Sequence, residues 1–232
     1  GGLLEARAGA LTNAITNLDQ LAGSLIAEVN KLHSEGQGLV GFESIASQYT
    51  IDDADAALNA AGLDLTPTNG SFQLHVTQQL TGARTTHLVQ IDLDGLGADT
   101  TLNTLAADID ARANVSVSVA SNGTMTLTAA GGYELSFSDD SSDALAALGI
   151  NGFFTGGGGE DIAVRADLTQ QTIAAATNHQ AGDNSNALRL AALADATFDD
   201  LGGVTLNQYY ADVVTELATE ASEQSAEAES AS

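Results

Sequence analysis

The first part of the chain carries apolar residues at alternating steps of four and three, the spacing of a helix that packs along a second helix. A helix carrying this stripe is about 42 Å long at about 1.5 Å per residue, and burying each large side chain gains about 1.5–3 kcal/mol. We therefore expect one helix from Leu3 to about Ser34, ended by Gly36 and Gly38, with its stripe covered by another helix. The stripe consists of Leu4, Ala8, Leu11, Ile15, Leu18, Ala22, Leu25, Val29 and Leu32.

The same spacing returns near the end of the chain. Thr205 and Gln208 have capping-box spacing, so we expect the last helix to begin at Thr205. Its stripe stops at Glu220, and the acidic end beyond it is expected to fray. The predicted packing seam therefore joins the two ends of the chain. It consists of Leu11, Ile15, Leu18, Leu25 and Val29 on the first helix and Tyr210, Val213 and Leu217 on the last.

Between Ser71 and Phe137 the apolar period is two, which predicts strands. A turn at Thr81–Gly82 separates the first two strands, and a helix over 102–109, capped by Asp99 or Thr100, follows them. The apolar residues of these strands are Phe72, Leu74 and Val76, then Val89, Ile91 and Leu93.

A second hairpin is predicted around Ser121-Asn122-Gly123. A two-residue loop would place the two apolar sets on opposite faces of the hairpin. A three-residue loop, with Gly123 left-handed, pairs Val119 with Met125 and keeps the apolar sets together. We therefore predict the three-residue loop.

The other segments complete an α+β fold. We expect a short helix over 52–61, a strand over 133–137, a helix over 143–148 ended by Gly149, a short strand over 162–164 and helices over 168–177 and 184–196. The predicted architecture is a long-helix stalk made from both chain ends, with an inserted small β-rich domain. Its boundaries are 1–38 and 156–232 for the discontinuous stalk and 39–155 for the insertion. Because the sequence opens inside a helix without Met, we expect a piece of a longer rod-like protein.

Composition narrows the possible partners. The sequence has 6 Lys and Arg against 31 Asp and Glu, a formal net charge of −25, so nucleic acid and anionic membrane surfaces would be repelled. No apolar run approaches the ~20 residues of a membrane span. The sequence has no Cys, which excludes disulfides, thiolate zinc sites and a Cys nucleophile.

Few residues suggest chemistry. Asp92, Asp94 and Asp99 invite a calcium interpretation, but an EF-hand would need a ligand at Leu96, so a strand end, turn and helix cap is favoured. A hypothesis that His75 and His87 face each other on one hairpin gives two metal ligands, yet no third ligand is placed. The segment 156–159 is followed by acidic residues rather than by the Lys of a phosphate loop, so we interpret it as a linker. No catalytic constellation, metal site or cofactor site is predicted.

Four stretches in this order resemble one family. They are GGLLEARAGALTNAITNLDQLAGSLIAEVNKLHSEG, HLVQIDLDGLGADTTLNTLAADIDA, ALGINGFFTGGGGEDIAV, and GDNSNALRLAAL followed by TLNQYYADVV. They are similar to bacterial flagellar hook-associated protein 1, a junction protein between hook and filament. The chain lacks the terminal helical segments of that family, and its TELATEASEQSAEAES departs from the family where a Gly is expected soon after the Tyr pair.

The resemblance implies a non-enzymatic axial protein, exported through the hollow flagellum and located outside the cell. Its implied partners are neighbouring copies, the hook protein and the next junction protein, and the fragment itself is expected to be monomeric. The alternative hypothesis is a secreted acidic adhesin-like module that binds calcium or a glycan.

Overall fold

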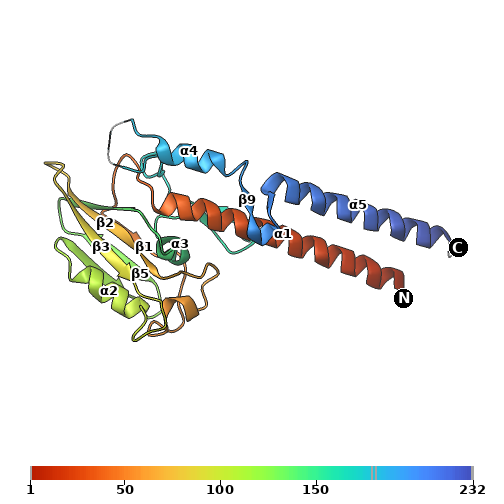
Figure 1. The fold of residues 1–232 in the computed structure, drawn as a ribbon, viewed down its shortest axis with the longest axis horizontal. Coiled ribbons are helices and arrows are strands. Elements are labelled where there is room, and N and C mark those ends of the chain that lie inside the picture. The colour runs from red at the N-terminus through yellow and green to blue at the C-terminus, as the bar shows by residue number, and fades with distance from the viewer. Residues whose placement is uncertain (1, 179, 181, 231–232) are drawn as a thin grey trace. The chain divides into compact units, whose positions relative to one another are not determined.

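The computed structural model describes residues 2–178, 180 and 182–230. Helices and antiparallel strands form two compact units (Figure 1). Unit 1 contains the described residues of Gly1–Ile26, Gly156–Ala163 and Ala192–Ser232, and unit 2 contains those of Ala27–Thr155 and Val164–Ala191. The predicted α+β class is confirmed, whereas the stalk made from both chain ends stays a prediction.

The division between the units differs from the predicted one. Residues 27–38 and 164–191 group with the β-rich unit. The reason lies in buried polar contacts: Asn30 accepts hydrogen bonds from the backbone of Phe153 and Phe154, and His33 is bound to Asn151. The last turns of helix α1 (Gly2–Ser34) are therefore part of unit 2.

Unit 2 is built on two antiparallel three-stranded sheets. One has the order β3-β2-β6, with β2 at Gly70–Gln78, β3 at Arg84–Ile91 and β6 at Tyr133–Ser138. The other has the order β1-β5-β4, with β1 at Ser44–Ala46, β4 at Val115–Val119 and β5 at Met125–Ala129.

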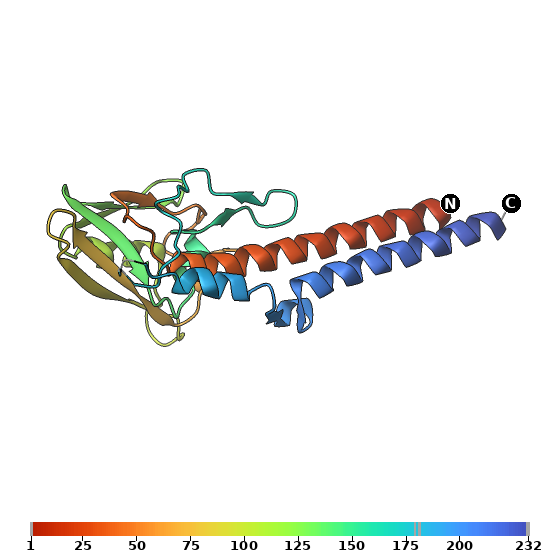
Figure 2. The same cartoon turned by 90° about the horizontal axis from the view of Figure 1, so that it is seen from above.

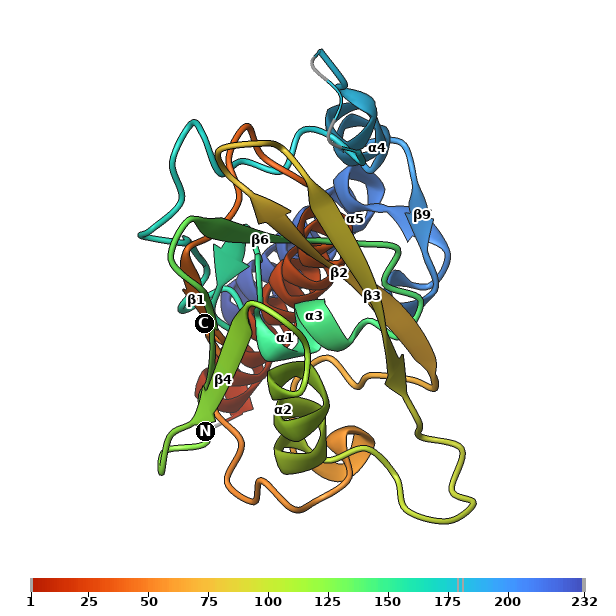
Figure 3. The same cartoon turned by 90° about the vertical axis from the view of Figure 1, so that its left-hand side faces the viewer.

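Helices α2 (Leu102–Asp110) and α3 (Ala144–Leu148) complete the core of unit 2, and α2 packs against β3 and β4 (Figure 3). The alternating residues of the strands and one face of α2 supply the buried side chains. They include Phe72, Leu74, Val89, Ile91, Leu102, Leu105, Ile109, Met125, Leu127, Leu135 and Phe137.

The second hairpin has the predicted register. Val119 pairs with Met125, and Gly123 has a φ of 75°. A Cβ at Gly123 would lie 1.8 Å from the carbonyl oxygen of Ile51. Glycine is therefore required there both for its backbone conformation and for its close neighbour.

Several predicted helices are wrong because tertiary contacts override local propensity. The segment 168–177 forms turns, because the Gln171 carbonyl accepts from the N–H groups of Leu39 and Val40, and Ala176 exchanges two backbone hydrogen bonds with Gln37. Only the 3₁₀ turn Leu58–Ala60 forms within 52–61. Helix α2 begins at Leu102 as expected, but its cap is Thr101, which forms a capping box with Thr104, rather than Asp99 or Thr100. Helix α4 spans Ser185–Ala192 rather than reaching 196.

The remaining elements belong to unit 1 or lie where the chain passes between the units. Strand β9 (Thr197–Phe198) pairs with β10 (Val204–Thr205), with the 3₁₀ turn Asp199–Leu201 between them. Strand β7 is Phe154–Thr155 and β8 is Ala163–Val164. None of the helices among the described residues has both the length and the apolar character needed to cross a membrane.

Helix α5 (Leu206–Ser230) has the predicted capping box, because Gln208 N–H donates to Thr205 Oγ1 and Thr205 N–H donates to Gln208 Oε1. The expected fraying after Glu220 is wrong, as the helix continues to Ser230. Its last turns are rich in Ala, Glu and Gln, which favour helix even without a packed apolar face.

Candidate assembly surface

Helices α1 and α5 lie side by side and antiparallel in unit 1 (Figure 2). Tyr209 at the start of α5 donates from its hydroxyl to Gln20 Oε1 at 3.0 Å. Further along, Ala10 and Glu220 line one shallow groove between the helices. Residue numbers rise along one helix as they fall along the other, which fixes the antiparallel direction.

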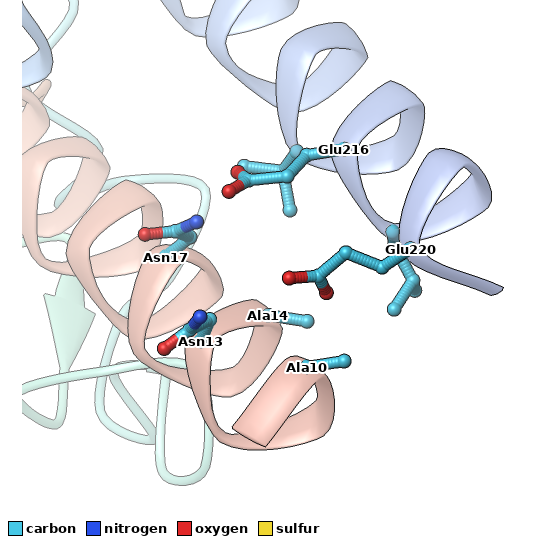
Figure 4. A pocket seen from close by; sticks show the side chains of 8 residues that line it. Ala10, Asn13, Ala14, Asn17, Glu216 and Glu220 are labelled. Carbon is cyan, nitrogen blue, oxygen red and sulfur yellow. The ribbon is translucent and has the colours of Figure 1, made fainter. Parts of the chain in front are cut away.

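The contact between α1 and α5 uses small side chains of α1. Ala10 and Ala14 are 8% and 9% exposed, and Val213 opposite them is 6% exposed. Asn13 and Asn17 on α1 and Glu216 and Glu220 on α5 form the polar wall of the groove (Figure 4).

The predicted seam does not coincide with this contact. Leu11, Ile15 and Leu18 are 59%, 52% and 41% exposed, and Tyr210 is 53% exposed. The expectation that these four side chains pack between the two helices is wrong. Leu217 is also exposed, but it lines the groove between the helices with Ala10 and Ala14.

Among the other seam residues, Val213 is buried, and Leu25 and Val29 are half-buried. The spacing of four and three identified residues that share one face of α1. Helix α5, however, contacts the adjacent face, which carries Ala10 and Ala14. The signal that the sequence reasoning missed is the pair of small residues at steps of four, Ala10 and Ala14, which are buried where α1 faces Val213 of α5.

The exposed apolar residues of both helices lie on the same side of the pair. Successive helical residues are about 100° apart, so Leu11 is turned by that angle from Ala10, and Val214 by the same angle from Val213. Because the two helices run antiparallel, a turn of about 100° in the chain direction leads away from the contact to the same side of the pair on both helices. We call this surface the apolar face. It consists of Leu11, Ile15 and Leu18 on α1 and Tyr210, Val214 and Leu217 on α5.

An acidic loop borders the apolar face on the α1 side. Asp19 follows Ile15 by one turn and accepts a hydrogen bond from Gly159 N–H at 3.0 Å, which holds the exposed Glu160 and Asp161 nearby. Asp161 accepts from the N–H groups of Gly157 and Gly158, and these bonds lower its pKa. The glycines thus bind a carboxylate of the chain itself. A Cβ at Gly23 would lie 3.4 Å from Gly157 O, at the limit of ordinary van der Waals contact.

The end of α1 in unit 2 is held by buried polar groups. His33 Nδ1 lies 2.7 Å from Asn151 O, and His33 Nε2 accepts from Ala174 N–H at 3.0 Å. This arrangement assigns the neutral tautomer with hydrogen on Nδ1. The pKa of His33 is lowered, first by burial and also by the charge of Arg165. Asn151 Nδ2 donates to the carbonyls of three α1-end residues, His33, Ser34 and Gly36.

The hypothesis that His75 and His87 face each other is contradicted by the register of strands β2 and β3. His87 pairs with Leu74, whose side chain is in the core, whereas His75 is the next residue of β2. Their side chains therefore point to opposite faces of the sheet. His75 contacts Thr86 and Ser138 instead, at 2.8 and 2.9 Å.

The three aspartates do come together. One ligand atom each of Asp92, Asp94 and Asp99 lies within 4.8 Å of the others. Two of these carboxylates also accept backbone N–H groups, Asp94 from Leu96 and Asp99 from Gly95. These bonds match the turn that the sequence favoured. The convergence of the three carboxylates also matches the calcium alternative.

Comparison with known proteins gives only distant structural neighbours. No family model matches the chain, and no curated protein matches it. Solved structures similar to it include the D2-D3 domains of the flagellar cap protein FliD from Serratia marcescens, 21% identical with a TM-score of 0.34, covering 55% of this chain and 64% of that one. The D1-D2-D3 domains of FliD from Escherichia coli are 13% identical with a TM-score of 0.31, covering 94% and 73%. The chain thus spans less than two thirds of the Serratia protein's chain.

Proposed function

We propose that this chain is an axial structural protein of the bacterial flagellum and forms part of the junction between hook and filament. Its sequence resemblance to hook-associated protein 1 supports the family. The observation that carries the structural role is the apolar face of unit 1, where Leu11 and Tyr210 are more than half exposed. An exposed row of large apolar side chains is typical of a surface that binds another protein.

In this role the protein acts by assembly rather than by catalysis. The long helices at both ends of the chain form a stalk, and the β-rich part is carried by it as an insertion. Neighbouring copies, the hook protein and the next junction protein supply the surfaces that bury the apolar face. The protein works outside the cell after export through the flagellar channel.

Deletion of the gene in the parent bacterium tests this role. We expect hooks without filaments in electron micrographs, with filament protein released into the medium, and restoration by the full-length gene. A full-length gene with Ile15→Asp and Val214→Asp should restore few filaments, although the variant protein still reaches the medium. The matched control, Thr16→Asp with Thr215→Asp, changes neighbouring exposed residues off the apolar face and should restore filaments. Normal filaments after deletion would refute the proposal.

The second candidate is the calcium- or glycan-binding module, which the convergence of Asp92, Asp94 and Asp99 favours. Calcium titration followed by thermal unfolding separates the two candidates. A rise in Tm with calcium that Asp94→Asn abolishes would support the binding module. An unchanged Tm would favour the turn, in which these carboxylates serve as hydrogen-bond acceptors.

A further inference from the structure

We propose that His33 is an acid-sensitive latch. It holds the segment 168–177 on the end of α1 while its ring is neutral, and it releases the segment when the ring takes up a proton. The residues concerned all belong to unit 2. The inference goes beyond the proposed function and does not rest on it, because it concerns a conformational change within unit 2 rather than an assembly surface.

Both ring nitrogens of His33 are engaged in the closed state. The side chain is completely buried, Nδ1–H donates to Asn151 O at 2.7 Å, and Nε2 accepts from Ala174 N–H at 3.0 Å. The ring of Phe153 packs edge-on against the imidazole, with the ring centroids 5.5 Å apart. Ala174 N–H therefore occupies the position at which the ring would take up a proton.

A proton on Nε2 is incompatible with this arrangement. It converts the nitrogen from an acceptor into a donor, so two N–H groups would point at each other and Ala174 N–H would lose its acceptor. A buried donor without a partner destabilises the state that contains it. The charge of Arg165 near the ring also acts against a second positive charge. The closed state therefore requires the neutral ring.

The charged groups on the elements around His33 are paired with one another. The segments 150–154 and 168–177 contain no charged residue. Near the end of α1, on α4 and in the segment 164–168, the ion pairs are Lys31–Glu28, Glu35–Arg189 and Arg165–Asp167. A protonated ring is thus better stabilised by water, which it reaches when the segment 168–177 moves away.

The bond between His33 and Ala174 lies at the centre of the contacts that hold the segment 168–177. Backbone hydrogen bonds join Gln171 and Ala176, on either side of Ala174 in the chain, to residues 37–40. Movement of Ala174 away from a protonated ring therefore acts on both of these contacts.

Helix α4 contributes to the same contacts. Asn186 Nδ2 donates to Ala174 O and to Leu32 O at 2.8 Å each. The apolar core of unit 2, by contrast, is built by described side chains that lie between Phe42 and Ile150 in the chain. Release of the segment 168–177 would therefore leave this core packed.

Amide hydrogen exchange, measured by NMR at pH 7.5 and 5.5 and corrected for the intrinsic rates, tests the latch. The open state binds a proton with the ordinary histidine pKa of about 6.5, whereas the closed state resists it, so the open fraction should rise by up to about tenfold. Protection of the Ala174 and Ala176 amides should fall by that factor. At both pH values these amides should stay less protected than the amide of Leu74 in β2, because the segment opens without the sheet.

Two variants assign the change to His33. His33→Gln retains a side-chain acceptor for Ala174 N–H but cannot titrate, so protection of Ala174 should change less than about twofold between the two pH values. His87→Gln replaces the half-buried histidine of β3 and should respond to pH like the original chain. Circular dichroism checks that each variant is folded.

Long-range ¹H–¹⁵N NMR spectra of the His33 ring provide a measurement that needs no variant. They should show hydrogen on Nδ1 at pH 7.5, and the ring should become protonated over the pH range in which Ala174 loses protection. The inference would be overturned by hydrogen on Nε2 at pH 7.5 or by protection of Ala174 that does not change with pH. It would equally be overturned by an undiminished pH response in His33→Gln, by a lost response in His87→Gln, or by equal protection of Ala174 and Leu74 at pH 5.5.

Discussion

Replacement of Asn151 by Ala should destabilise unit 2 by about 3–5 kcal/mol, because each buried polar group left without a partner costs about 1–3 kcal/mol. The Asn151 amide donates to the carbonyls of His33, Ser34 and Gly36 at 3.0–3.1 Å. It has two hydrogens for these three acceptors, so the loss corresponds to at least two hydrogen bonds. Asn151 also has a φ of 54°, where Ala is disfavoured by about 1 kcal/mol more.

Urea unfolding followed by circular dichroism measures the loss, and hydrogen exchange should place the new openings at the end of α1. Asn151→Gly removes the same amide without the backbone penalty, so it should be about 1 kcal/mol more stable than Asn151→Ala. Asn59→Ala, at an exposed position, is the control and should change stability by less than about 0.5 kcal/mol. A loss below about 1 kcal/mol for Asn151→Ala would refute the argument, since the carbonyls would then have other donors.

Three further predictions concern single positions. Burial lowers the pKa of His33 in the folded state, so the unfolded chain binds more protons near the ordinary pKa of about 6.5, and folding stability should fall as pH drops through that range. His33→Gln should reduce the difference in urea midpoint between pH 7.5 and 5.5, and an unchanged difference would exclude His33 as its source. Gly123→Ala should lower Tm by more than about 5 °C, as its Cβ would lie 1.8 Å from Ile51 O; an unaltered melting curve would contradict the hairpin geometry. Leu18→Asp should lower the free energy of unfolding in urea by less than about 1 kcal/mol, because the Leu18 side chain is exposed. Ala14→Asp should lower it by about 2 kcal/mol or more, because Ala14 is buried at the α1–α5 contact. A larger loss for Leu18→Asp than for Ala14→Asp would support the predicted seam instead.

Features determined by neighbouring residues were predictable from the sequence. The register of Val119 with Met125 follows from keeping two apolar sets on one face, and the start of α5 follows from the spacing of Thr205 and Gln208. In both cases the deciding interactions lie within a few residues of each other. Local turn and cap chemistry therefore fixes the outcome.

Features determined by distant contacts were not predictable in this way. The segment 168–177 has a helical pattern, but its backbone groups pair with residues 37–40, more than a hundred positions away. Likewise, the helical period shows that Leu11 and Ile15 share a face, but it does not show which face meets α5. Propensity and period carry no information on such partners.

The contact through Ala10 and Ala14 has a consequence for how specificity could change. Both methyl groups are buried opposite Val213, so a bulkier residue at either alanine would push α5 away from α1. The two exposed rows of apolar side chains would then move apart, although none of their residues had changed. Substitution of a buried residue, rather than of an exposed one, would thus alter the spacing that a partner of this surface meets.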